Sequence, residues 1–323
     1  MEPNDLIEII ECKTAEILLD QLSYSRGQIW DNSRYLWSTS REWIFRGVSR
    51  ADYPLRPAAF RDNAFTYFIP GQAELAILKA TDQRNYEDSV IVQFCTKTDR
   101  LGIPVPGDHP ELRDLRSAIQ DYDPAEFPPI KKLHMFALAQ HYGIPTRLLD
   151  WTRKPLVAAY FAAEKVAKVR SKRFAEPDVS GNDPCAIWAL DAGFIRTMSE
   201  KARTNRSIDP EIILVTAPTV TNPNLAAQGG LFTLVQPRSG DPHPLPDLDS
   251  AITQLAKHVP TDVAQFSPFL YKLTLPATET RSLMRLLAIQ GVDAAAVRPG
   301  LAGVADSLRE CWSHQFAPPG QRS

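Results

Sequence analysis

The stretch QHYGIPTRLLDWTRKPLVAAYFAAE, residues 140–164, decides the fold because it joins the end of one helix to a strand and then to a second helix. Gly143 followed by Pro145 is a strong helix stop. TRLLDW has the length and composition of a short strand. The helix after it accepts Pro155 in its first turn and runs to about Val169. Because this second helix is apolar nearly all round, we expect it to be central.

The same stretch holds more polar side chains than turns and caps require. Either Asp150 or Thr152 can cap the second helix, so one of them is left for another task. Arg147 and Asp150 lie three apart on a strand and therefore face opposite sides. His141, at the end of the first helix, can bond the terminal carbonyls or act in catalysis. Tyr142 beside it can stack on a ligand ring or pack in the core.

Apolar patterning elsewhere in the chain predicts short strands mixed with helices, without strict β-α-β alternation. Further helices are expected at 6–24, 74–99, 110–120, 131–142 and 278–290. Further strands are expected at 42–48, 185–191, 211–216, 231–235, 270–276 and 293–297. This mixture predicts an α+β fold.

One domain is expected to account for most of the chain. We predict that it spans residues 41–310 and contains a helical insertion at about 62–130. Residues 1–40 are expected to form an N-terminal helical extension, and residues 311–323 a C-terminal tail. No internal repeat divides the domain further.

Composition places the chain among ordinary globular proteins. Of its 323 residues, 44% are hydrophobic and 23% are charged, and the formal net charge is −2. That charge excludes the global basic field on which generic nucleic-acid binding depends. The arginines nevertheless crowd locally, since six of them fall between residues 34 and 61. Such a run is either a functional patch or, more commonly, a solvated face.

Targeting and metal-binding motifs are not found. The N-terminal MEPND has neither the basic nor the apolar region of a secretory signal, and the longest apolar run, 156–163, is too short to span a bilayer. We therefore expect a cytoplasmic protein without membrane contact. Four single cysteines without a CxxC pair fit reduced, packed thiols. None of the six histidines lies in an HxxxH or HExxH pattern, so we expect no metal site.

Four segments resemble, in order, the FRG domain family. They are WIFRGV at 43–48, QHYGIPTRLLDWTRKPLVAAYFA at 140–162, NPNLAAQGGLF at 222–232 and GVDAAAVRPGLAGVADSL at 291–308. The family is named after the triplet Phe-Arg-Gly, here Phe45-Arg46-Gly47, and its members are often linked with bacterial defence against phage. The resemblance covers about residues 40–310.

Two positions depart from the family pattern. The family usually has an arginine where this chain has Asn224, and a Phe-Pro pair where it has Arg298-Pro299. If the family arginine binds a ligand, that contact is missing here.

A fainter similarity connects the chain with NAD-dependent ADP-ribosyltransferases. These enzymes carry an arginine or histidine on a first strand, small hydroxyl residues on a second strand before an Ala-x-x-Phe-Ala helix, and a Glu or a substitute on a later strand. Here FRG resembles the first element, TRLLDWT followed by VAAYFA resembles the second, and Gln228 occupies the place of the third. The resemblance implies a single mixed or antiparallel split-sheet domain with helical additions, and NAD as the substrate.

The same resemblance implies roles for individual residues. The implied catalytic residues are Arg46, His141, Asp150 and Gln228, and the implied NAD contacts are Arg46, Gly47, Tyr142, Thr146, Arg147 and Thr152. Arg46 suits phosphate or ribose as a planar donor, although a structural ion pair is equally common for such a residue. Gly47 would let a ligand approach the backbone. Gln228 supplies no negative charge to balance an oxocarbenium ion, so Asp150 is the candidate for that charge.

Three functions were weighed against these residues. The first is an ADP-ribosyltransferase-like enzyme that cleaves the nicotinamide–ribose bond of NAD, by transfer to an unidentified acceptor macromolecule or by hydrolysis. The second is a non-catalytic nucleotide-binding sensor or protein-interaction module, which accounts better for the missing Glu. The third, a metal-dependent nuclease or hydrolase, requires clustered carboxylates or histidines that the sequence does not show. We place the first narrowly ahead of the second.

Overall fold

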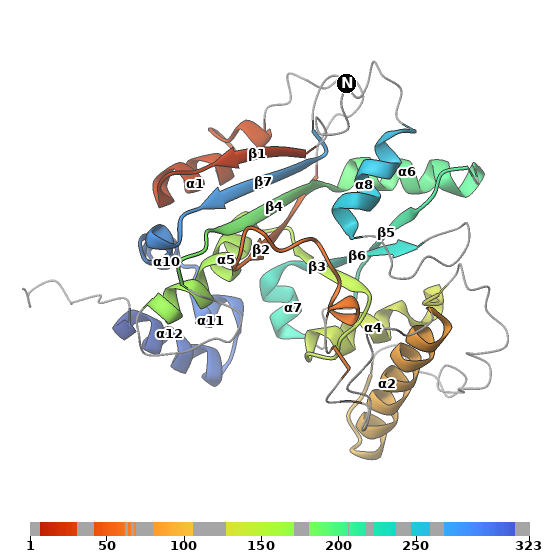
Figure 1. The fold of residues 1–323 in the computed structure, drawn as a ribbon. Helices are drawn as coiled ribbons and strands as arrows, with labels where there is room; N and C mark the ends of the chain where they lie inside the picture. Colours follow the sequence, from red (N-terminus) through yellow and green to blue (C-terminus); the bar gives the residue numbers. More distant parts are fainter. Residues whose placement is uncertain are drawn as a thin grey trace, which may run out of the picture.

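The computed structural model describes residues 7–30, 42–61, 64–65, 68, 80–105, 127–170, 181–205, 207–217, 222–236, 247–258 and 268–313. These residues form a seven-stranded sheet with helices on both faces (Figure 1). The sheet is mixed, because its first two strands in spatial order run parallel and the other neighbours are antiparallel. The predicted α+β class is confirmed.

The strands follow the order β1-β7-β4-β2-β3-β6-β5 across the sheet. Their bounds are β1 (Ile7–Glu11), β2 (Trp43–Val48), β3 (Leu148–Thr152), β4 (Cys185–Asp191), β5 (Glu211–Val215), β6 (Gly230–Gln236) and β7 (Leu270–Leu275). Five of the strands predicted from the sequence are therefore confirmed, together with TRLLDW as β3.

The helices divide between the two faces of the sheet. Their bounds are α1 (Ala15–Leu22), α2 (Ala80–Arg100), α4 (Leu133–His141), α5 (Pro155–Arg170), α6 (Ala192–Thr204), α7 (Pro223–Gln228), α8 (Leu248–Ala256), α10 (Thr280–Ile289), α11 (Ala294–Val297) and α12 (Leu301–Ser313). One apolar core packs α1, α5 and α10 against the sheet, and a second packs α6 and α8 against the opposite face. A third core joins α2 and α4 to β3 and β6.

The centre of the sheet is split between β2 and β3. Each of these strands is fully paired on its other side, β2 with β4 and β3 with β6. Between them a single residue pair remains, Phe45 with Thr152. Beyond that pair the two strands diverge, which leaves a gap in the middle of the sheet.

The stretch at 140–164 folds as its pattern predicts. Gly143 has φ +85°, a left-handed conformation that ends α4 without the penalty of a side chain. Helix α5 begins at Pro155, later than the capping roles of Asp150 and Thr152 required, so neither of them caps it. The Thr152 hydroxyl instead accepts a hydrogen bond of 2.9 Å from the backbone N–H of Lys154, in the turn before the helix. The Asp150 carboxylate bonds Gln140 and Arg46. Helix α5 is buried along most of its length, as its apolar composition requires.

Two of the predicted elements are wrong. Residues 7–11 form strand β1, not the start of a helix. Their apolar pattern fits a helix as well as a strand, and the parallel pairing with β7 decides for the strand. Residues 294–297 form helix α11, not a strand. There Asp293 caps the turn by accepting from the N–H of Ala296 at 2.9 Å, and the alanines that follow favour a helix. The predicted helix at 110–120 lies outside the described residues.

Helices α6, α8 and α12 have no counterpart among the predicted elements. None of the described helices has both the length and the hydropathy that a membrane crossing demands. Cys12, Cys95 and Cys185 are buried free thiols, and Cys311 is half-buried. Burial raises the pKa of Cys12 to about 11 and that of Cys185 to about 12, so both stay protonated at neutral pH.

Candidate functional site

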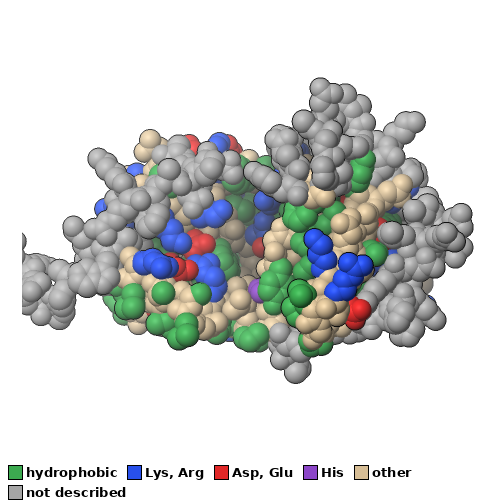
Figure 2. Space-filling model, turned by 90° about the horizontal axis from the view of Figure 1, so that it is seen from below, with side chains coloured by type: hydrophobic (Ala, Val, Ile, Leu, Met, Phe, Trp, Pro, Cys, Tyr) green, Lys and Arg blue, Asp and Glu red, His purple; other side chains and the backbone are tan. Residues whose placement is uncertain are grey.

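A cleft of about 800 Å³ opens where β2 and β3 diverge. Figure 2, which views the molecule from below Figure 1, shows a hollow in the middle of the surface, with lysine and arginine side chains gathered at its edges. The walls come from β2 and the loop after it, the end of α4, β3, α5, α7, the start of β6, and Arg298. Segments that are far apart in the chain therefore meet around one space.

Residues from both faces of β2 line this cleft. Phe45 packs with the core on the α5 side, and Val48 packs with the core on the opposite side, yet both border the cleft together with Arg46 and Gly47. An intact sheet would separate the two faces. The cleft therefore enters the gap between the split strands.

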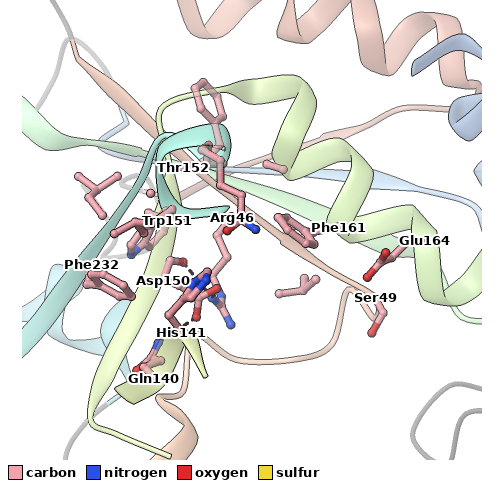
Figure 3. Close-up of a pocket in the computed structure, with 18 of the residues that line it drawn as sticks. Arg46, Ser49, Gln140, His141, Asp150, Trp151, Thr152, Phe161, Glu164 and Phe232 are labelled. Atoms are coloured by element: carbon pink, nitrogen blue, oxygen red, sulfur yellow. Dashed lines mark hydrogen bonds and ion pairs between the residues drawn. The ribbon is translucent and has the colours of Figure 1, made fainter. Parts of the chain in front are cut away.

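Arg46 bridges that gap. Its Nη1 donates to the backbone carbonyl of Asp150 at 2.9 Å and lies 2.7 Å from the Asp150 Oδ2 (Figure 3). Only 10% of the Arg46 side chain is exposed, and its Nε–H is buried without a hydrogen-bond partner. The side chain therefore ties β2 to β3 at the point where the backbone pairing has ended.

Asp150 presents its carboxylate to the cleft. The walls surround this side chain, although 63% of it remains exposed. The surrounding walls remove part of the solvent from the carboxylate and so raise the pKa of Asp150, but the adjacent Arg46 guanidinium, aided by Arg61, outweighs that effect and holds the pKa below its usual value. The carboxylate is therefore ionised at neutral pH.

Replacing Asp150 by Asn tests the pairing with Arg46. Because the folded-state pKa lies below the unfolded value of about 3.9, the pair stabilises the fold above that pH and stops doing so as the pH falls through the folded-state pKa. We expect Asp150→Asn to lower Tm near neutral pH, and the difference from wild type to shrink below about pH 4. Calorimetric scans across the acid range measure this difference in Tm.

In the control variant Asp306→Asn, which loses an exposed pair with Arg309, we expect little change in Tm at any pH. A Tm difference for Asp150→Asn that persists unchanged into strong acid would contradict the assignment.

A short hydrogen-bonded chain orients Asp150 from behind. The buried Thr146 hydroxyl donates to Gln140 Oε1, and Gln140 Nε2 donates to Asp150 Oδ1 at 3.1 Å. The backbone N–H of Leu148 donates to the Thr146 hydroxyl at 3.1 Å. Thr146, which the sequence suggested as an NAD contact, is thus not among the residues lining the cleft and acts through Gln140.

His141 lines the cleft beside Asp150, whereas Tyr142 does not. Burial lowers the pKa of His141 and the charge of Asp150 opposes this only in part, so the imidazole is neutral at pH 7. The Tyr142 side chain is 63% exposed and lies near Phe94, with ring centroids 6.4 Å apart. It therefore neither packs in the core nor reaches the cleft.

Thr152 and Gln228 join β3 to the segment before β6. The Thr152 hydroxyl donates to the backbone carbonyl of Gln228, besides accepting from the Lys154 N–H in the turn before α5. The Gln228 side chain lines the cleft, and its Nε2 donates to the Val297 carbonyl at 3.1 Å. Its amide nitrogen therefore has a structural partner, and Gly229 after it, at φ +61°, ends α7.

Gly47 is required by helix packing. A Cβ at this position would lie 2.0 Å from the Ala158 carbonyl oxygen and 2.6 Å from the Ala162 nitrogen, both in the backbone of α5. The close approach that this glycine permits is therefore that of α5. Gly47 also lines the cleft, so the ligand contact expected from the sequence stays a prediction.

Arg147 lies outside the cleft. Its Nε and Nη2 donate to the two carboxylate oxygens of Glu87, each at 2.8 Å, and its guanidinium lies 4.4 Å from the centre of the Phe127 ring. The side chains of Arg147 and Glu87 are buried, at 6% and 0% exposure. Arg147, just before β3, thus anchors α2 to this strand. It does not line the cleft, where the sequence had suggested that it contacts NAD.

The cleft also contains charged residues that the sequence had not singled out as site residues. Five cations and two carboxylates line it: Arg46, Arg56, Arg61, Lys165 and Arg298, with Asp150 and Glu164. The arginine run at 34–61 was the available signal for two of them. Glu164 and Lys165 stood out as charges on an apolar helix, and Arg298 as a departure from the family pattern. The cleft is thus positive in a chain whose net charge is −2.

Glu164 and Arg298 belong to a partly buried network at the wall of the cleft. Arg298 Nη2 donates to Glu164 Oε2 at 2.7 Å and to the Tyr160 hydroxyl at 2.8 Å. The Tyr160 hydroxyl donates to Glu310 in α12. Arg298 is therefore largely neutralised, and it attaches the C-terminal helices to α5.

The described residues contain no group of three or more His, Cys, Asp and Glu side chains placed to hold a metal ion. Polar groups for an organic ligand are plentiful, by contrast. Arginines can bind phosphate bidentately, and the Asp150 carboxylate and the neutral His141 imidazole can accept protons or hydrogen bonds.

The fold and this cleft define an α+β protein with a cationic cleft at a split sheet. Residues 41–171 match the model of the FRG domain, so this part of the chain is an FRG domain. The match includes Arg46, His141 and Asp150 and ends before Gln228 and Arg298; the extension of the domain to residue 310 stays a prediction. No curated protein and no solved structure matches the chain in the same comparisons.

Proposed function

We propose that the cleft binds NAD⁺ and that the protein cleaves the bond between nicotinamide and ribose. The observation that carries this proposal is that Arg46, His141, Asp150 and Gln228 line one cleft with an excess of positive charge. A dinucleotide suits such a cleft, because guanidinium groups bind its phosphates bidentately. Its volume is also within the range of small-molecule sites.

Asp150 is the residue on which the chemistry would depend. When the glycosidic bond breaks, its electron pair leaves with nicotinamide, which becomes neutral, and positive charge develops on the ribose. A fixed carboxylate stabilises this oxocarbenium-like transition state without needing to reorganise. The lowered pKa of Asp150 keeps that charge available at neutral pH.

His141 is suited to the second half of the reaction. A water molecule or an acceptor hydroxyl adds to the ribose carbon and must lose a proton. A neutral imidazole accepts that proton, and burial keeps His141 neutral at pH 7. Arg46, through its contacts with the carbonyl and carboxylate of Asp150, holds the acidic group in place and can share its remaining donors with the ligand.

Release of nicotinamide from NAD⁺ tests the proposal. We expect the full chain to release it, and Asp150→Asn to reduce the rate by about 100-fold or more, since one preorganised electrostatic group contributes on that scale. Arg26→Gln removes an exposed arginine paired with Asp20 and serves as the control, with an unchanged rate. Chromatography of the products separates hydrolysis from transfer. No release above a protein-free background, with candidate acceptors present, would refute the proposal.

A non-catalytic sensor or interaction module is the second candidate. It is favoured by one observation, namely that several polar groups of the cleft already bind protein partners: Arg46 binds Asp150, and the Gln228 amide binds Val297. Calorimetric binding of NAD⁺ without turnover, abolished in Arg46→Ala, would favour this function over the enzyme.

A further inference from the structure

Arg61 has an unusual environment for an arginine at the edge of a cleft. Its Nε and Nη2 both donate to the backbone carbonyl of Arg56, at 3.3 and 3.2 Å. Within the described part of the chain no carboxylate forms an ion pair with it. The guanidinium is thus held in one place by a neutral acceptor, and its charge has no carboxylate in direct contact.

The neighbouring arginines differ from Arg61 in this respect. Arg56 donates from Nε and Nη2 to both carboxylate oxygens of Asp247, at 2.8 and 2.9 Å. Arg46 pairs with Asp150. On the other side of the cleft Arg298 pairs with Glu164. Arg61 is therefore the arginine of the cleft whose positive charge is available to a ligand.

Electrostatics agree with that geometry. Burial and the positive charge of Arg46 lower the pKa of Arg61, whereas Asp150 acts in the opposite direction. Arg61 and Arg46 line the same cleft, and their positive charges repel each other. An anion placed between them would relieve the repulsion and would be attracted by both.

We propose that Arg61, with Arg46 beside it, forms a subsite for the phosphate groups of the ligand. The subsite assigns where the diphosphate of NAD⁺ lies. That the phosphates belong to a dinucleotide rests on the proposed function. Arg56 contributes its backbone carbonyl, which orients the Arg61 guanidinium, while its own side chain clamps Asp247. A preorganised guanidinium loses little conformational freedom on binding and therefore binds more tightly.

Calorimetric titration of the full chain with inorganic pyrophosphate and with ADP-ribose tests the subsite without requiring turnover. We expect both to bind wild type and to bind Arg61→Gln about tenfold or more weakly, as the loss of one charge-assisted contact implies. Arg26→Gln removes the same charge at a remote exposed pair and is expected to bind like wild type. Nicotinamide riboside, which lacks phosphate, is expected to bind wild type and Arg61→Gln equally.

The outcomes separate this proposal from the enzymatic one. Weaker pyrophosphate binding in Arg61→Gln without any NAD⁺ cleavage would leave the subsite standing and remove the proposed reaction. NAD⁺ cleavage with equal pyrophosphate affinity in wild type and Arg61→Gln would do the reverse. The subsite is also overturned if wild type binds neither probe at millimolar concentration, or if malonate, a dicarboxylate, binds as tightly as pyrophosphate.

Discussion

Arg147→Met is expected to lower the free energy of unfolding by about 3–5 kcal/mol, the usual result of breaking a buried ion pair. The substitution leaves the Glu87 carboxylate, which has no exposed surface, without its bidentate partner. It also removes the contact of the guanidinium with the Phe127 ring. Chemical denaturation of the purified variant measures the loss.

Arg153→Met provides a matched comparison. This arginine also pairs with a glutamate, Glu42, but both side chains are partly exposed, so we expect a loss of no more than about 1 kcal/mol. The double variant Arg147→Met/Glu87→Met should recover much of the stability, because it buries no unpaired charge. If Arg147→Met were as stable as Arg153→Met but bound NAD⁺ poorly, Arg147 would be a ligand residue and the assignment as an anchor of α2 would be wrong.

Gly47→Ala is expected to destabilise the fold by about 1–3 kcal/mol or more, as overpacking does. The new Cβ would lie 2.0 Å from the Ala158 carbonyl oxygen, and backbone cannot move aside as a side chain can. Helix α5 would have to move away from β2. Because Ala158, Phe161 and Glu164 of α5 line the cleft, ligand affinity should fall together with stability.

Gly193→Ala is the control for Gly47→Ala. Its Cβ would meet one side-chain oxygen, that of Asp191, at 3.1 Å, and alanine is favoured within a helix such as α6. We expect a Tm within a few degrees of wild type. A Gly47→Ala protein with wild-type stability would show that α5 does not pack on β2 as closely as described.

The split sheet explains how one cleft can collect so many polar groups. Strands β2 and β3 are each paired fully on one side, which fixes their positions, while the single pair between them leaves room for side chains. Arg46 fills part of that room and holds Asp150 at its edge. A ligand entering there would meet groups supported by the rigid centre of the sheet, which is where precise geometry is easiest to maintain.

Local features of this protein could be predicted from sequence because their interactions span few residues. The stop at Gly143 depends on its own φ, and the turn at Thr152 involves an N–H two residues away. The apolar pattern of α5 likewise reports a buried helix wherever that helix packs. The α+β class followed from the sum of such elements.

Which polar residues belong to the site was decided by tertiary structure. Thr152 and Asp150 were equal candidates for the helix cap, but in the fold Thr152 bonds the turn before α5, and Asp150 pairs with Arg46 at the cleft. Arg147 pairs with Glu87, sixty positions earlier, and so does not serve the site. Arg61 became a candidate ligand residue because, within the described fold, no carboxylate forms an ion pair with it. The task of a long side chain depends on which partner the fold brings within about 3 Å, and that partner leaves no trace in the local pattern. Strand β1 shows the same limit, since its pairing partner β7 lies more than 250 residues away.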